Sequence, residues 1–293
     1  MRSIKEETLA YIFILPALSI IFIFHIVPAL YALRISLYSW DMISSVKEFV
    51  GLKNYILLLY DKEFWKSLFN TVYFTLGVVP LSILISLVIA LFLNTKIRGL
   101  SFYRSVYFLP VVTSMNAVAM VWLWIYNPDY GILNYLLGKI GISSQKWLLS
   151  PYLAMPAVIL MSIWKSLGYN IVIYLVGLQN IPEEYYSAAQ VDGGGRFAML
   201  KHITVPLLMP TTFFIITVSF ISAFHTFTQI YMLTPDGGPL KSTSLIVYYL
   251  YQNAFVFFKM GYASAMAFVL FIIMFLFTLL QHKFLEKRIH YEI

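Results

Sequence analysis

The chain has 293 residues, of which 60% are hydrophobic and only 11% are charged, and its formal net charge is +7. About a quarter of the residues in an ordinary soluble domain are charged, so this composition excludes that class and indicates an integral membrane protein. The absence of cysteine excludes disulfides, thiolate metal sites and cysteine nucleophiles. Lysines and arginines are spread thinly between apolar runs, which indicates loop charge that orients a membrane protein and not a nucleic-acid surface.

Six apolar stretches can each supply the roughly 20 helical residues that cross a bilayer. No β-barrel alternation is visible, so the expected fold is all-α, a polytopic membrane protein with six transmembrane helices in a single domain, 1–293. The first stretch resembles a secretory signal, but its apolar run is too long and lacks a small-x-small site, so we expect a retained span. The expected spans are 9–36, 67–93, 105–126, 152–179, 206–233 and 261–281.

Six spans place both termini on one side of the membrane. Lysines and arginines together divide almost evenly, ten in the segments on the terminal side and eight on the other, whereas five of the six arginines lie on the terminal side, at Arg2, Arg98, Arg104, Arg196 and Arg288. The excess of positive charge in cytoplasmic loops therefore predicts that both termini are cytoplasmic.

All thirteen acidic residues lie outside the six expected spans. Proton-driven transporters usually depend on carboxylates or histidines at membrane depth, although a sodium site can be built from backbone carbonyls. A secondary transporter is therefore disfavoured, and the energy for uphill transport is expected to come from another subunit. The chain also lacks a nucleotide-binding P-loop, a zinc-binding H-E-x-x-H and a G-x-S-x-G nucleophile elbow, so we expect no enzyme, no metal site and no cofactor bound by this chain.

The cytoplasmic segment 180–206, "NIPEEYYSAAQVDGGGRFAMLKHITVP", interrupts the apolar pattern. Asn180 can cap a helix and Pro182 suits its first turn. Gly193 can adopt the left-handed conformation that ends a helix. A second short helix near 197–203 then leads into the next span, so we expect a helix-turn-helix whose alanine-rich face lets another protein approach closely.

This segment resembles the signature E-A-A-x3-G-x9-I-x-L-P of the membrane-spanning subunits of binding-protein-dependent ABC importers. The chain has Ser187-Ala188-Ala189, then Gly193, then Ile203-Thr204-Val205-Pro206. Ser187 replaces the glutamate of the signature and Val205 replaces its leucine. Because that glutamate helps to bind the ATPase in the family, the resemblance implies that Glu184 or Asp192 carries more of the contact here.

Other pieces, in the same order across six spans, resemble the maltose-type and glycerol-phosphate-type branch: "FYRSVYFLPVV", "NPDYGILN", "LTPDGGPLKSTSLIVYYLYQNAF" and "GYASA". The resemblance implies a permease subunit in a prokaryotic plasma membrane that forms half of the pathway for a sugar. Its implied partners are a second permease subunit, two ATPase subunits that use ATP and Mg, and an extracellular solute-binding protein. The alternatives are the same architecture importing glycerol phosphate or another polar solute, or a secondary transporter.

The resemblance assigns ATPase coupling to Glu184, Ser187, Ala188, Ala189, Asp192 and Gly193. Lys165 lies near the middle of its expected span, too deep to reach the interface easily. Two interpretations stay open: a cavity-facing cation for sugar hydroxyls or an acidic substituent, and a packing contact with a carboxylate or carbonyl of a partner subunit. The other expected substrate-pathway residues are Ser114, Asn116, Gly168, Tyr169, Asn170, Ser219, Ser222, His225 and Thr226.

Overall fold

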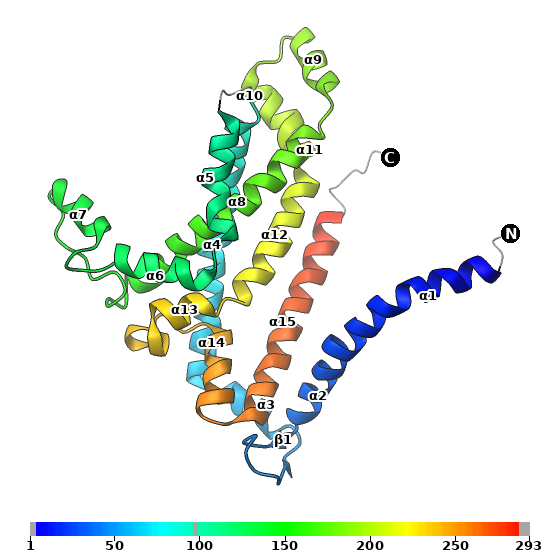
Figure 1. The fold of residues 1–293 in the computed structure, drawn as a ribbon, viewed down its shortest axis with the longest axis vertical. Coiled ribbons are helices and arrows are strands. Elements are labelled where there is room, and N and C mark those ends of the chain that lie inside the picture. Colours follow the sequence, from blue (N-terminus) through cyan, green and yellow to red (C-terminus); the bar gives the residue numbers. More distant parts are fainter. Residues whose placement is uncertain (1–3, 96–98, 287–293) are drawn as a thin grey trace. The chain divides into compact units, whose positions relative to one another are not determined.

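The computed structural model describes residues 4–95 and 99–286, and within them the regular secondary structure is almost entirely helical (Figure 1). The α-helices are α1 (Ile4–Ile21), α2 (Val27–Ile35), α3 (Lys53–Tyr60), α4 (Lys62–Leu93), α5 (Leu100–Val112), α6 (Met115–Ile125), α7 (Ile132–Lys139), α8 (Ala154–Gln179), α9 (Glu183–Val191), α10 (Arg196–Met199), α11 (Val205–Leu207), α12 (Met209–Phe224), α13 (Thr228–Leu233), α14 (Ile246–Tyr251) and α15 (Met260–Glu286). One two-residue strand pair, β1 (Tyr38–Ser39) and β2 (Glu48–Phe49), is antiparallel. The all-α expectation is confirmed.

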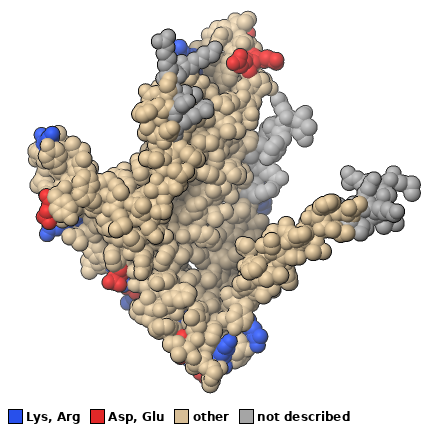
Figure 2. All heavy atoms as spheres, in the orientation of Figure 1, with Lys and Arg blue, Asp and Glu red and all other residues tan. Residues whose placement is uncertain are grey.

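In the part of the chain that the structure describes, four helical stretches are long and apolar enough to cross a membrane: Tyr11–Ile35, Lys62–Leu93, Ala154–Gln179 and Met260–Gln281. Two bent helix pairs raise the number to six if each pair is one span. On the face shown in Figure 2, charged side chains lie near loops and helix ends, and the helices between them present uncharged surface. Such surface suits hydrocarbon, where a charged side chain is costly.

The expected span 105–126 is not one continuous helix, because the chain turns by 110° between Ser105–Val112 and Met115–Ile125. Thr113 and Ser114 are extended at the turn, and the Ser114 hydroxyl accepts a hydrogen bond from the Ala117 backbone N–H at 3.4 Å, as an N-cap does. On the other side, the Thr113 hydroxyl donates to the Leu109 carbonyl at 2.8 Å. A cap residue inside an apolar run therefore ends one helix and starts another.

The expected span 206–233 also differs from the structure. Helical structure runs from Arg196 through Leu207, so the second short helix does not end before Pro206, and it meets α12 at a bend of 59°. Pro206 lies inside this continuous helical stretch, where it has no N–H to donate to a preceding carbonyl, and the π-helical turn Leu200–Thr204 comes directly before α11. The far end of α12 is Phe224, and residues 225–227 separate it from α13.

Contacts divide the chain into two compact units, one with residues up to Lys62 plus Leu250–Phe275, the other with Glu63–Tyr249 and residues from Leu276. The core of the second unit forms around α8, which packs against α5, α12 and α13. The side chains of Val158, Met161, Ile171 and Tyr174 are fully buried there. Burial on several sides fixes α8 by close van der Waals packing, because lipid tails are as apolar as these side chains and supply no hydrophobic driving force between helices.

In the first unit, polar contacts join the start of α15 to the segment after α2. The Asn54 amide donates to the carbonyls of Ser36 and Tyr38 at 2.7 and 3.0 Å. Gly261 lies so close that a Cβ there would be 1.9 Å from the Tyr38 oxygen. The Tyr262 hydroxyl donates to the Asp61 carboxylate. These contacts order the loop between α2 and α3 without a large apolar core.

Asn134 organises the loop around α7. Its side-chain amide donates to Pro128 O at 3.1 Å, Ser144 Oγ at 2.9 Å and Gln145 O at 3.0 Å. Its side-chain oxygen accepts from the Gln145 backbone N–H at 3.1 Å and from the Trp147 indole at 2.9 Å. One residue that is 8% exposed thus fixes both ends of the loop.

We therefore expect Asn134→Ala to loosen this loop, because several of the partners lose their hydrogen bonds at a cost of about 1–3 kcal/mol for a buried group. Limited proteolysis of the purified protein should cut 126–148 faster in this variant. The control is Gln145→Ala, since that amide donates only locally, to Ser143 O at 2.9 Å. Equal cleavage of both variants would contradict the role given to Asn134.

Candidate functional site

A cavity of about 350 Å³ lies in the second unit between α4, α8, α12 and α13. Six of the residues expected in the substrate pathway line it: Lys165, Tyr169, Asn170, Ser219, Ser222 and Thr226. The structure also brings in polar residues that the sequence reasoning missed, namely Ser82, Ser162, Ser166 and Gln229. The remaining lining is apolar, from Phe74, Val78, Val218 and Ala223.

The missed serines follow a pattern that the sequence contains. Ser162, Ser166 and Tyr169 recur at helical spacing and therefore share a face of α8 with Lys165. The long helix α4 carries a buried polar row at Ser67, Thr71, Thr75, Ser82 and Ser86. Such a row in an otherwise apolar helix indicates a face turned away from lipid.

Several hydroxyl protons in the cavity are used by backbone carbonyls of the same helix. Ser82 donates to Val79 O at 3.0 Å, Ser162 to Val158 O at 2.8 Å and Ser166 to Ile163 O at 2.9 Å. Each oxygen keeps lone pairs, because a hydroxyl has one donor and two acceptor positions. The serine side of the cavity can therefore accept hydrogen bonds from a hydroxylated solute.

Asn170 supplies the complementary donor. Its side chain is 1% exposed, and its amide nitrogen has no hydrogen-bond partner within the described protein. A buried unsatisfied donor costs about 1–3 kcal/mol, so it gains stability from an acceptor brought into the cavity.

Lys165 points to the α5–α6 break. Its ammonium donates to Thr113 O at 2.6 Å, to Val111 O at 3.2 Å and to Pro110 O. These carbonyls belong to the C-terminal end of α5, where helical carbonyls lack intrahelical partners and carry partial negative charge. The lysine thus acts as a cap for the end of another helix in the same chain.

The other expected pathway residues lie elsewhere. Gly168 is buried against α5, where a Cβ would be 2.1 Å from the Tyr107 carbonyl oxygen, so its smallness allows α5 and α8 to approach. Ser114 caps α6, and Asn116 is exposed on the first turn of that helix. His225 is exposed at the end of α12. These four residues are not among the described residues that line the cavity.

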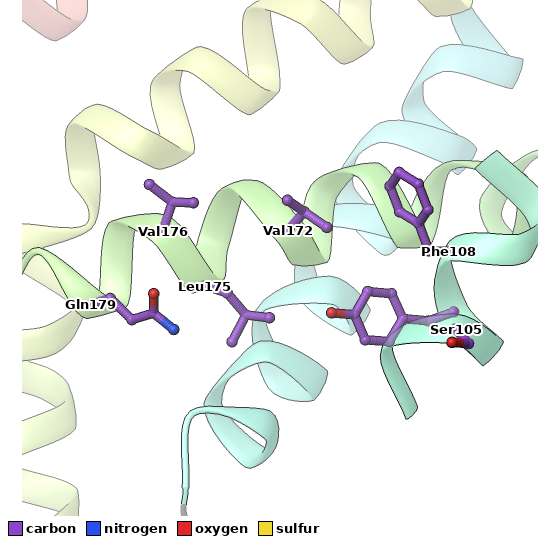
Figure 3. A pocket seen from close by; sticks show the side chains of 7 residues that line it. Ser105, Phe108, Val172, Leu175, Val176 and Gln179 are labelled. Carbon is purple, nitrogen blue, oxygen red and sulfur yellow. The ribbon is translucent and has the colours of Figure 1, made fainter. Parts of the chain in front are cut away.

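A second cavity, of about 460 Å³, lies between α5 and α8. Figure 3 shows lining side chains of Ser105 and Phe108 on α5 and of Val172, Leu175, Val176 and Gln179 on α8. Its lining is mostly apolar and contains none of the expected pathway residues. Its chemistry suits hydrocarbon better than a polar solute.

The segment expected to couple to an ATPase forms α9, which lies with α10 at one end of the second unit (Figure 1). No residue of α9 is buried, and Val191 is 88% exposed. Glu184, Ser187, Ala188 and Asp192 are exposed, and Ala189 is half-buried. Asn180 does not cap this helix but ends α8, and Pro182 stands at the N-cap position.

The turn after α9 has the expected conformation at Gly193, whose φ is +78°. Gly194 donates from its backbone to Ala189 O at 2.7 Å and closes the helix end. The Tyr186 and Thr204 hydroxyls are 3.0 Å apart, which ties α9 to the segment that leads into α12. The α9 segment is therefore fixed to the helices behind it while its outer face stays open.

Comparison with known proteins decides the family. The sequence model of the protein family described as binding-protein-dependent transport system inner membrane component matches residues 57–291. The chain belongs to this family. It is 37% identical to a probable ABC transporter permease protein, YurN, of Bacillus subtilis, over 96% of this chain and 97% of that one.

Two further family relatives carry names that state a solute. The chain is 34% identical to the trehalose/maltose transport system permease protein MalF of Thermococcus litoralis, over 95% of this chain and 94% of that one. It is 30% identical to the sn-glycerol-3-phosphate transport system permease protein UgpA of Yersinia pestis, over 97% of this chain and 96% of that one. The resemblance inferred from the loop signature is thereby confirmed.

The fold is also found in a solved member of an ABC importer. A chain of a bacterial ABC transporter involved in the import of the acidic polysaccharide alginate superposes with a TM-score of 0.81 at 21% identity, covering 97% of each chain. The chain is thus an inner-membrane permease component of a binding-protein-dependent transport system, with the architecture of that class.

Proposed function

We propose that this chain is one permease subunit of an ATP-driven importer, forming half of the pathway for a sugar or oligosaccharide that an extracellular solute-binding protein delivers. A second permease subunit completes the pathway and two ATPase subunits supply the energy. The chain itself hydrolyses nothing and binds no cofactor. Both termini lie in the cytoplasm of a prokaryotic cell, on the side of α9.

One observation carries the proposal: α9 stands in the connection between α8 and α12, the two helices that contribute most of the polar lining of the cavity. A partner that moves α9 therefore also moves α8 and α12, which line the cavity. ATP shifts such an equilibrium only if it binds the closed ATPase pair more tightly than the open one. The exposed α9 residues Glu184, Ser187, Ala188 and Asp192, with half-buried Ala189 and Gly193 at the turn, are assigned to the ATPase contact.

The cavity supports a hydroxylated solute. Serine oxygens accept hydrogen bonds, and the buried Asn170 amide offers a donor. Tyr169, 43% exposed, adds an aromatic face to the lining. Sugars present alternating hydroxyls and C–H faces, so this mixture of small polar groups and one ring suits them.

The test of the ATPase contact uses the natural absence of cysteine. Ala188→Cys places a single thiol on α9, and the complex is purified from its native membrane after treatment with a short thiol-to-amine cross-linker. We expect the cross-linked product to contain an ATP-binding subunit, and Ser45→Cys, in the loop after α2, to give none. A product from Ala188→Cys that lacks an ATPase would contradict the assignment.

A further inference from the structure

Lys165 has no hydrogen-bonding capacity left for a solute. An ammonium group has three donors and no acceptor. Three backbone carbonyls already accept from it, those of Pro110, Val111 and Thr113. To bind an anionic substituent directly, the lysine would have to release one carbonyl at the end of α5.

That release carries its own cost. The last carbonyls of a helix have no intrahelical partner, and Pro110 and Val111 belong to the last turn of α5. Thr113 is the extended residue at which the chain turns by 110°. Lys165 therefore holds the break in a shape that the backbone alone does not stabilise.

The surroundings of the ammonium also disfavour an anion. The partial negative charge of a helix C-terminus offsets part of a neighbouring positive charge. An anion that approaches Lys165 meets the three carbonyl oxygens that share the ammonium. The other polar groups of the described lining are hydroxyls and amides, and none is a second cation.

We propose that Lys165 is a positioning residue that holds the α5–α6 break, and that this half of the cavity consequently favours an uncharged, polyhydroxylated solute over an anionic one. The inference rests on the proposed function and narrows it to neutral saccharides. In this proposal Lys165 fixes the position of the α5–α6 break, and the Asn170 amide and the serine oxygens contact the solute.

The first experiment measures ATP-dependent uptake by cells that express the complete importer, with four probes. Maltose and trehalose are neutral, whereas sn-glycerol 3-phosphate and an alginate trisaccharide are anionic. We expect a neutral probe to enter at least about tenfold faster than either anionic one, the ratio that corresponds to one charged hydrogen bond. Faster uptake of an anionic probe overturns this inference and leaves the importer intact. Uptake of none overturns the proposed sugar import and the inference with it.

The second experiment separates positioning from contact by means of variants at Lys165. Lys165→Met should lower the maximal uptake rate about tenfold or more while the half-saturating concentration stays within about twofold, because the solute itself loses no partner. Lys165→Arg, which keeps a cation with several donors, should recover part of the rate. The control is Lys66→Met, which removes a lysine that donates to a single carbonyl, Leu240 O at 2.7 Å. A Lys165→Met variant with the wild-type rate, or one changed only in half-saturation, would overturn the assignment.

Discussion

Replacing Gly193 with valine is expected to leave the importer assembled but to uncouple ATP hydrolysis from uptake. Gly193 has a φ of +78°, and a Cβ there would touch nothing within 4 Å. The effect of a side chain is therefore conformational: a residue other than glycine in this region costs about 1–2 kcal/mol, and a β-branched one suffers most. A change in the backbone of the turn would relieve this strain, and it would also change the orientation of α9 relative to the helices behind it.

The measurement is the number of solute molecules imported per ATP hydrolysed, in proteoliposomes that contain the purified complex. A shift of about 1.4 kcal/mol is tenfold in an equilibrium, so we expect the ratio to fall about tenfold. Gly195→Val is the matched control, because Gly195 also has open space around it but adopts an extended backbone with a φ of −75°. Normal solute-stimulated ATPase activity and coupling in Gly193→Val would refute the role of this turn.

Gly168→Ala is expected to destabilise the protein by about 1–3 kcal/mol, the usual cost of overpacking. The added Cβ would be 2.1 Å from the Tyr107 oxygen and 2.7 Å from the Val111 side chain. Backbone cannot move aside as a flexible side chain can, so α5 and α8 must separate. That movement also pulls the α5 end away from Lys165, one turn earlier on α8.

Gly138→Ala provides the matched control, since Gly138 lies in helix α7 with nothing within 4 Å of the added Cβ. There the change should be neutral or stabilising by about 0.5–1 kcal/mol, because alanine is the better helix former. The unfolding temperature of the purified complex compares the two variants. Equal unfolding temperatures would show that α5 and α8 are not in the contact described.

Much of the fold follows from the apolar pattern, because about 20 consecutive apolar residues in lipid have few alternatives to a helix. The length of an apolar run predicts where a helix lies, but it does not predict a break that depends on a few local hydrogen bonds. The sequence around the turn at Thr113 and Ser114 is mostly apolar and does not mark a break. The turn is fixed by the hydroxyls of these two residues and by Lys165 from another helix. The end of α12 at Phe224 has neither glycine nor proline to mark it.

The candidate site also combines residues that the sequence pattern predicts with contacts that it does not predict. Ser219, Ser222 and Thr226 share a face at spacings of three and four, and the structure places all three on the cavity. The sequence places Lys165 as a cation at membrane depth, but its hydrogen-bond partners lie 52–55 residues away in the chain, and no sequence pattern connects them to it. The family resemblance predicts Gly168 in the substrate pathway, whereas the structure packs it against α5.

The central claim is that this chain supplies a path and no energy, and that α9 receives the movement. The most direct test compares uptake of maltose and trehalose by proteoliposomes that hold the complete complex with uptake by proteoliposomes made without the ATPase subunits, each with the binding protein and with ATP on the α9 side. The account predicts accumulation only when the ATPase is present. Accumulation in the vesicles that lack it would contradict the account.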